Sequence, residues 1–300
     1  MNARTPSRPQ ILVYGEVLFD CFPDGSTVLG GAPFNVAWNL QGLGAEPVFV
    51  SRVGDDEQGE QIRSAMEDWK MVTAGLQTDA QRPTGKVEVS FHDGEPAYEI
   101  VADCAYDFIE AEALSLDFSA CSLIVHGTLA LRGATSRGSF ESIMKTARIP
   151  SFYDVNLRDP WWDRETVREY LRRTEIVKLN EDELLRLVPQ AGSLSERALS
   201  MLALGPKTVC LTRGEKGAAV YERGECLAQV EPGQGVEVID TVGAGDAFAS
   251  GFILGRVHEW EIQTTMQRAQ DFAGAVVGRR GATLKDESFY RRFRKSWGLS

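Results

Sequence analysis

The sequence predicts an α/β protein whose central sheet is mostly parallel and flanked by helices. From Ser122 onward, short apolar strands alternate with segments of helical periodicity, which is the pattern of repeated strand–helix units. Before that point, a hairpin at 86–101 alternates apolar and polar residues, as in a sheet with one covered and one solvated face, and a second hairpin lies at 17–29. We therefore expect a main sheet and a second, small sheet within one domain spanning residues 1–300.

The first third of the chain is expected to supply the small sheet and the start of the main sheet. Strands are predicted at residues 11–14, 17–22, 27–29 and 47–53, and helices at 33–43 and 58–70. A hairpin pairs 86–91 with 97–101 around a His-Asp-Gly-Glu turn. Segments of about 17–30 and 85–107 then form the small sheet; the alternative is an ordinary hairpin at the edge of the main sheet.

The rest of the chain is expected to complete the main sheet. Strands are predicted at 122–127, 151–156, 175–180, 208–213 and 218–223. Helices are predicted at 137–148, 164–173, 181–188, 195–204, 246–258 and 264–277. Ligands of open α/β sheets bind beyond the carboxyl ends of the strands, and polar residues gather there after successive strands.

The composition of the chain disfavours several classes of binding partner and site. The net charge of −11 does not favour a nucleic acid, whose phosphates attract basic surfaces. The five cysteines form no Cys-x-x-Cys pair and the three histidines show no metal-ligand spacing, so a disulfide framework or zinc site is not expected. We find no signal peptide and no apolar run of 18 residues. The expected compartment is the cytoplasm, without a membrane partner.

The stretch VEVIDTVGAGDAFASGF, residues 236–252, predicts a strand, a glycine turn and a helix in succession. Val236, Val238 and Ile239 suggest the strand, and the helix is expected to open at Asp246. The N-terminus of a helix presents unpaired N–H groups and favours negative charge. Glycines at such a turn let the backbone approach an anion closely, so the stretch predicts an anion-binding site.

Asp246 is an unusual residue for a simple phosphate site. A carboxylate beside an anion site suits a general base, which takes a proton while N–H groups stabilise a transferring phosphoryl group. The alternative is that Asp246 only caps the helix, which is a common role for aspartate. The spacing alone leaves both roles open.

Two signatures resemble the ribokinase-like (PfkB) sugar kinase family. DTVGAGDAFASGF is similar to its C-terminal signature, in which the aspartate after GAG is the catalytic base. GGAPFNVAWNLQGLG at 30–44, followed by VGDDEQG at 53–59, is similar to its N-terminal signature. The resemblance runs from residue 11 to about 284. It implies a ribokinase-like fold in which the small sheet is a lid over the sugar, and in some members the lid also forms a homodimer.

The resemblance also implies roles for individual residues. The catalytic group comprises Asp246, Gly243, Ala244, Gly245 and Arg158. The sugar contacts comprise Asp20, Gly31, Asn35, Asn156, Arg158 and Asp246. The ATP contacts comprise Asn180, Thr212, Gly214, Gly217, Gly243, Gly245 and Gln270, of which Gln270 departs from the family's usual Asn. Glu183 is implied in Mg²⁺ binding through water, and Asp240 in a monovalent-cation site that K⁺ could fill.

These residues lead us to expect an ATP-dependent sugar kinase that uses Mg²⁺. GEVLFD, AYDFI, DVNLRDPWW and KLNEDEL make the chain most similar to fructokinases, which convert D-fructose and ATP to fructose 6-phosphate and ADP. Kinases of 2-keto-3-deoxygluconate or ribose are close alternatives, since one scaffold serves them all. A catalytically silent nucleotide- or sugar-binding regulator is the rival from another class. An oxidoreductase is disfavoured because no GxGxxG follows the first strand.

Overall fold

The computed structural model describes residues 10–299 except 93–94, 115, 190–191 and 234–237. Its main sheet has nine strands in the order β13-β12-β11-β10-β9-β8-β1-β4-β5. Neighbours from β5 to β11 are parallel, and β12 and β13 continue antiparallel at one edge. The strands are β1 Gln10–Tyr14, β4 Val48–Gly54, β5 Leu76–Asp79, β8 Cys121–His126, β9 Ser151–Asp154, β10 Ile176–Asn180, β11 Thr208–Thr212, β12 Ala218–Glu222 and β13 Glu225–Val230.

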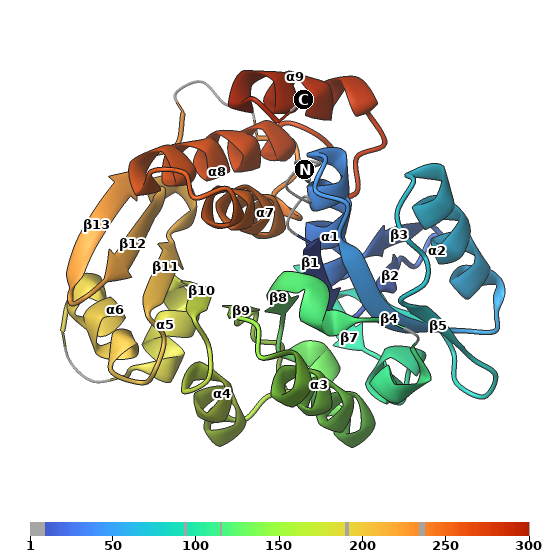
Figure 1. The fold of residues 1–300 in the computed structure, drawn as a ribbon. Helices are drawn as coiled ribbons and strands as arrows, with labels where there is room; N and C mark the ends of the chain where they lie inside the picture. The colour runs from blue at the N-terminus through green and yellow to red at the C-terminus, as the bar shows by residue number, and fades with distance from the viewer. Residues whose placement is uncertain (1–9, 93–94, 115, 190–191, 234–237, 300) are drawn as a thin grey trace, which may run out of the picture.

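Helices cover both faces of this sheet, as expected, because its strands are apolar on both sides (Figure 1). In β1, Ile11 and Val13 pack into a core with α1, α2 and α7 to α9, while Leu12 and Tyr14 pack into a second core with α3 to α6. The helices are α1 Ala32–Gly42, α2 Glu57–Asp68, α3 Ala134–Ala147, α4 Arg164–Leu171, α5 Glu181–Leu187, α6 Leu194–Leu202, α7 Ala244–Val257, α8 Ile262–Val277 and α9 Glu287–Trp297.

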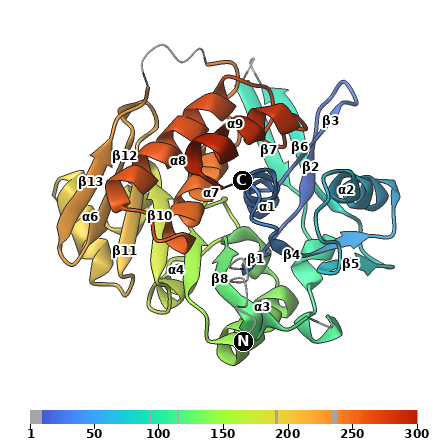
Figure 2. The ribbon, with the colours of Figure 1, turned by 45° about the horizontal axis from the view of Figure 1, so that its top comes forward.

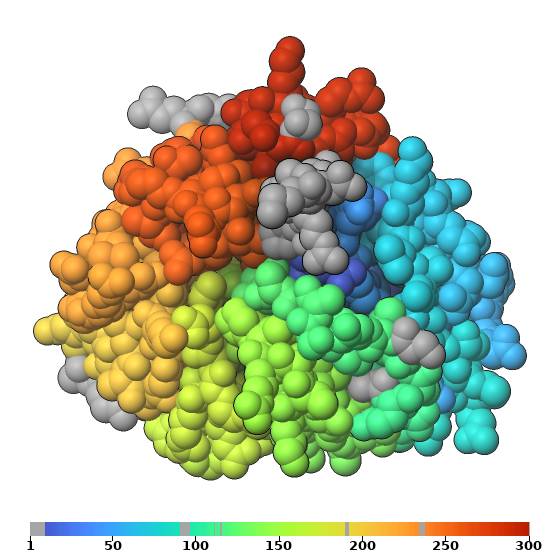
Figure 3. Space-filling model, in the orientation of Figure 1, coloured from blue at the N-terminus to red at the C-terminus, as the bar shows by residue number. Residues whose placement is uncertain are grey.

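Short 3₁₀ turns join several of these elements, at Ala105–Phe108, Ala111–Ala113, Phe118–Ala120, Leu129–Arg132 and Gly214–Lys216. In the space-filling view the C-terminal helices, in red, lie close to the blue and cyan segments from the first hundred residues (Figure 3). The contacts of α1 with α7 and α9 bring the two ends of the chain together. Within the described ranges, none of the helices has the length and apolarity that crossing a membrane requires.

The predicted small sheet is present and separate from the main one, which excludes the edge-hairpin alternative (Figure 2). It has four strands in the order β3-β2-β6-β7: β2 Leu18–Cys21, β3 Thr27–Gly30, β6 Gly85–His92 and β7 Glu95–Ile100. The two hairpins meet through parallel pairing of β2 with β6. One face packs on the rest of the protein through Phe19, which belongs to the core around α1.

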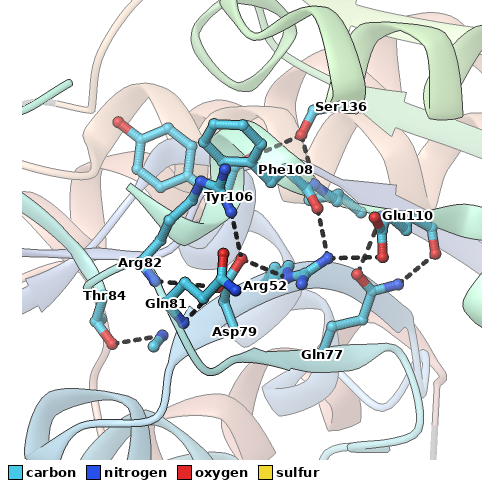
Figure 4. A network of polar contacts seen from close by, with 12 residues as sticks. Arg52, Gln77, Asp79, Gln81, Arg82, Thr84, Tyr106, Phe108, Glu110 and Ser136 are labelled. Atoms are coloured by element: carbon cyan, nitrogen blue, oxygen red, sulfur yellow. Dashed lines mark hydrogen bonds and ion pairs between the residues drawn. The ribbon is translucent and has the colours of Figure 1, made fainter. Parts of the chain in front are cut away.

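A polar network attaches the segment after β7 to the edge of the main sheet (Figure 4). Arg52 on β4 forms ion pairs with Asp79 at 3.0 Å and Glu110 at 2.9 Å, and donates to the carbonyl of Phe108. The guanidinium of Arg82 lies 3.4 Å from the centre of the Phe108 ring. Two residues earlier, Tyr106 packs against the start of β6, so this network supports the base of the small sheet.

The structure departs from the sequence predictions at several elements. The strands β5 and β13 and the helix α9 were not expected. The strand predicted at 236–239 is wrong for Val238 and Ile239, which lie outside any strand and are 60% and 53% exposed; Val236 lies outside the described residues. The N–H of Ile239 donates to the carbonyl of Val277 at the end of α8, and not to a neighbouring strand. The β-branched side chain of Ile239 is therefore not a sign of strand pairing at this position.

Candidate active site

A cavity of about 980 Å³ lies where the carboxyl ends of the central strands meet the small sheet. One wall comes from Leu18, Val28, Val87, Tyr98 and Ile100 of the small sheet. Asp246 lines the same cavity, so the small sheet stands over the residue that the sequence singled out. The cavity brings together every predicted site residue except Asp240: Asp20, Gly31, Asn35, Asn156, Arg158, Asn180, Glu183, Thr212, Gly214, Gly217, Gly243, Ala244, Gly245, Asp246 and Gln270.

The glycine turn before α7 has the geometry expected of an anion site. The helix begins at Ala244, two residues before the predicted start, because Gly243 adopts a left-handed conformation (φ 79°) and serves as the N-cap residue. A Cβ at position 243 would lie 2.4 Å from the Cβ of Ala282, so only glycine fits there. Residues 243–246 line the cavity, and the N–H groups of a first helical turn lack partners within the helix, so this turn can bind an anion.

Asp246 is the third residue of α7 and does not cap it, since the N-terminus of this helix has no side-chain cap. Its Oδ2 instead accepts a hydrogen bond of 2.8 Å from Nδ2 of Asn35 on α1. Burial, assisted by the neighbouring Asp154, raises the pKa of Asp246 to about 6, against the lowering effect of Lys178, Asn35 and Arg158. A carboxylate with a pKa near 6 remains ionised at neutral pH and is a stronger base than a solvated aspartate.

Beneath the glycine turn lies an ion pair between adjacent strands, Asp154 at the end of β9 and Lys178 in β10. Nζ of Lys178 is 2.7 Å from Oδ2 of Asp154, and both side chains are 8% exposed. The same Nζ would lie 3.4 Å from a Cβ at Gly245, which places the ammonium directly against the turn. Burial lowers the pKa of Lys178, but Asp154 and Asp246 outweigh it and the net shift is upward, so the lysine stays charged.

Sequence reasoning missed Lys178 as a site residue. The available signal was a single lysine inside the apolar strand IVKLN, because a charge in a strand buried on both faces needs a partner. Glu16, which follows β1, was missed as well. It lines the cavity and is buried, and burial raises its pKa to about 7 while Arg158 acts in the opposite direction.

Asn180 and Glu183 form a capping box at the start of α5. Glu183 N–H donates to Oδ1 of Asn180, and Asn180 N–H donates to Oε2 of Glu183. The other carboxylate oxygen, Oε1, accepts from the N–H of Leu157, so Glu183 also fixes the segment that carries Asn156 and Arg158. Burial raises the pKa of Glu183. A role in Mg²⁺ binding through water stays a prediction.

The remaining residues divide the cavity into two ends. Asp20 from β2, Gly31 and Asn35 gather on the small-sheet side with Asn156 and Arg158. Thr212, Gly214, Gly217 and Gln270 lie on the other side, together with the apolar or small residues Val238, Val242, Ala273, Gly274 and Val277. Gly31 has φ 108°, and a Cβ there would lie 2.7 Å from the carbonyl oxygen of Glu16. The absence of a side chain therefore lets the segment between β3 and α1 pack closely against the backbone of Glu16.

Asp240 does not line the cavity. Its Oδ1 accepts from the N–H of Val242 at 2.9 Å and its Oδ2 from that of Gly281 at 3.0 Å, so it joins two loops beside the glycine turn. Its role in a cation site stays a prediction. Across the described part of the chain, no group of three or more His, Cys, Asp or Glu residues is arranged to hold a metal ion. The oxygen donors of Asn180 and Glu183 line the cavity, and oxygen donors of this kind suit Mg²⁺ held largely by phosphate oxygens and water.

Comparison with known proteins identifies the family. Residues 10–288 match the family described as pfkB family carbohydrate kinase. A fructokinase from Vibrio alginolyticus is 30% identical over 293 residues, which span 91% of this chain and 94% of that protein. The chain belongs to the pfkB family of carbohydrate kinases. A fructokinase from Klebsiella pneumoniae is 31% identical over 261 residues, covering 82% of this kinase and 84% of that protein.

Solved structures show that this kinase has the ribokinase-like fold. A fructokinase from Xylella fastidiosa with bound ATP superposes with a TM-score of 0.83 at 22% identity, covering 97% of this chain and 99% of that one. A double-mutant fructokinase from Vibrio cholerae O395, with fructose, ADP and potassium ion bound, has a TM-score of 0.81 at 24% identity, with coverages of 96% and 99%. An E. coli protein described as ribokinase II, in complex with ATP and Mg²⁺, has a TM-score of 0.80 at 21% identity, also with coverages of 96% and 99%.

Proposed function

We propose that this carbohydrate kinase is an ATP-dependent fructokinase in which Asp246 is the general base. The observation that carries the proposal is the position of Asp246: a half-buried carboxylate in the first turn of α7, directly after the Gly243–Gly245 turn, with its Oδ2 held by Asn35. That arrangement places a base and an anion site side by side. The reaction needs both, because a hydroxyl loses its proton as negative charge moves on the transferring phosphoryl group.

In the proposed reaction, a primary hydroxyl of the sugar attacks the γ-phosphorus of ATP in line. The new bond joins the sugar oxygen to phosphorus, the bond from phosphorus to the β–γ bridging oxygen breaks, and ADP leaves with that oxygen. Asp246 accepts the hydroxyl proton. The N–H groups at the start of α7 and the ammonium of Lys178 stabilise charge on the phosphoryl oxygens, and Arg158 approaches them from the small-sheet side.

ATP is proposed to lie along the glycine turn with its base toward Gln270, between Thr212, Gly214 and Gly217. Asn180 and Glu183 line the cavity and are proposed to contact water molecules bound to Mg²⁺. That ion would neutralise phosphate charge. Potassium ion is seen in the V. cholerae relative, which supports testing a monovalent-cation requirement through the loop that Asp240 holds.

Fructose is the proposed substrate because two relatives that match over more than four fifths of their own length, from V. alginolyticus and K. pneumoniae, are fructokinases. Ribose and 2-keto-3-deoxygluconate remain the alternatives. The small sheet is proposed to close over the sugar and to exclude water, which would otherwise accept the phosphoryl group. Residues 1–300 acting as one kinase domain, a homodimer through this sheet and a cytoplasmic location stay predictions.

The test is an assay of ADP release with ATP, Mg²⁺ and a sugar panel of fructose, ribose, tagatose, glucose, 2-keto-3-deoxygluconate and adenosine. We expect fructose to have the highest kcat/KM. A clear preference for another sugar would overturn the assignment of fructose as the substrate and leave the kinase assignment intact. Binding of ATP and a sugar without ADP release would instead favour the silent regulator.

A further inference from the structure

Two buried acceptor oxygen atoms on the sugar side of the cavity have no hydrogen-bond partner within the described residues. Glu16 is 2% exposed, and its Oε2 receives no hydrogen bond. Asn35 is 5% exposed; its Nδ2 donates to Asp246, which leaves its Oδ1 without a donor. Both residues line the cavity. Buried acceptors that the protein leaves unpaired are costly, so we expect the ligand to supply the missing donors.

The charges on this side of the cavity are mainly negative. Glu16, Asp20 and Asp246 contribute three carboxyl groups, and the pKa of each is raised by burial and lowered by the guanidinium of Arg158; for Asp246, Lys178 lowers the pKa as well. The charge of Arg158 is therefore shared among three acids. Lys178, the other cation lining the described cavity wall near Asp246, is held by Asp154 at 2.7 Å.

We propose that the sugar subsite selects a neutral, polyhydroxylated substrate over sugar acids and sugar phosphates, and that Glu16 is a specificity-determining residue that hydrogen-bonds a substrate hydroxyl. This inference rests on the proposed kinase function. A sugar hydroxyl offers a donor to the unpaired oxygens of Glu16 and Asn35, whereas carboxylate and phosphate oxygens offer only acceptors. An anionic group would also lie against three acids, while the two nearby cations are already engaged: Arg158 is shared among these acids and Lys178 is paired with Asp154. Like charges placed together at an interface are strongly unfavourable.

The protonation behaviour of Glu16 is compatible with this role. Burial raises the pKa of its carboxyl to about 7, so both forms are populated near neutral pH. The ionised form accepts from a hydroxyl, and the protonated form donates to one. A sugar hydroxyl can satisfy either form, because it is both a donor and an acceptor.

The first test compares substrates on the unaltered enzyme. Turnover with ATP and Mg²⁺, and binding by calorimetry, are measured for fructose, ribose and glucose and for two anions, 2-keto-3-deoxygluconate and fructose 6-phosphate. We expect the best neutral sugar to exceed both anions by about 10²-fold or more in kcat/KM, in line with the penalty for like charges. An anion that is the best substrate, or binds as tightly as the best neutral sugar, would overturn the inference. Neutral sugars that bind selectively without turnover would overturn the kinase proposal alone.

The second test is Glu16→Gln, which keeps the size of the side chain and removes its charge. We expect the KM for the best neutral sugar to rise about tenfold while the KM for ATP changes less than about twofold, because only the sugar touches this group. Glu88→Gln is the matched control: it removes a carboxylate from the exposed side of β6 in the same small sheet and should change neither KM.

An unchanged sugar KM in a folded Glu16→Gln protein would refute the assignment of Glu16. If that variant does not fold, Asp20→Asn tests the charge argument in its place. Removing this acid weakens the repulsion between the protein and an anionic substrate. The ratio of kcat/KM for 2-keto-3-deoxygluconate to kcat/KM for fructose should therefore rise by about tenfold or more. A ratio unchanged within twofold would contradict the proposed selection against anions.

Discussion

Asn35 Nδ2 lies 2.8 Å from Asp246 Oδ2, and this hydrogen bond joins residues 211 positions apart in the chain. Each residue belongs to one of the two signatures recognised in the sequence. The bond forms because α1 packs directly against α7, where the hydroxyl of Ser250 also donates to the carbonyl of Val36 on α1. The N-terminal signature therefore orients the carboxylate that the C-terminal signature supplies.

The first prediction concerns this bond. Asn35→Asp places a second carboxyl against Asp246, and two neighbouring carboxyls resist ionising together, so the pKa of the base should rise. Because the ionised form of Asp246 is the active one, kcat/KM rises with pH through its pKa, which is about 6 in the parent. We expect the acidic limb of the pH profile to move upward by about one unit or more in the variant. If the variant binds ATP normally and the acidic limb of its pH profile does not move, ionisation of Asp246 does not set that limb.

The second prediction concerns Asp154 and Lys178. Lys178→Met leaves Asp154 buried without its partner, and breaking a buried pair in this way typically costs about 3–5 kcal/mol of stability. The double variant Asp154→Asn, Lys178→Met has no unpaired charge and should recover most of that loss. Its kcat should stay low, because the ammonium beside Gly245 is still missing. Chemical denaturation and kcat of the parent, the single variant and the double variant test this, and a double variant with normal kcat would exclude Lys178 from catalysis.

The third prediction concerns Gly243. Gly243→Ala forces a side chain into a left-handed conformation 2.4 Å from the Cβ of Ala282, so the turn must move. Displacing catalytic groups by about 1 Å can cost about 10²-fold in rate, and we expect kcat to fall by that order. The matched control is Gly298→Ala, which has a similar φ of 72° but no atom within 4 Å of the added Cβ. It should lose a comparable amount of backbone stability and keep its kcat. Equal kcat in both variants would contradict the proposed role of the turn.

The sequence predicted the fold and the gathering of the site residues because both depend on local patterns. The glycines and Asp246 lie within four consecutive positions, and the strand–helix alternation from Ser122 onward predicts the sheet edge at which the polar residues after β9, β10 and β11 gather. Lys178 and Glu16 were missed because their importance depends on which strands become neighbours: Lys178 is unremarkable until β9 brings Asp154 against it. The wrong strand at Val238 and Ile239 has the same origin, since β-branched residues indicate a strand only where a neighbouring strand can pair with them.

The central claim, that Asp246 is the general base, is tested most directly by Asp246→Asn. Asparagine keeps the size of the side chain, and the structure shows no helix cap to lose, so the thermal midpoint should stay close to that of the parent. Asp163→Asn is the matched control, because Asp163 does cap a helix, α4, through the N–H of Thr166, and asparagine caps about as well.

The measurement is kcat with ATP and the best sugar, alongside ATP affinity and the thermal midpoint. We predict that Asp246→Asn lowers kcat by about 10² to 10⁴, the usual effect of removing a general base, while ATP binds at least as well and the protein stays folded. Asp163→Asn should match the parent in all three. A kcat within about threefold of the parent for Asp246→Asn, far short of a general-base effect, would contradict the assignment.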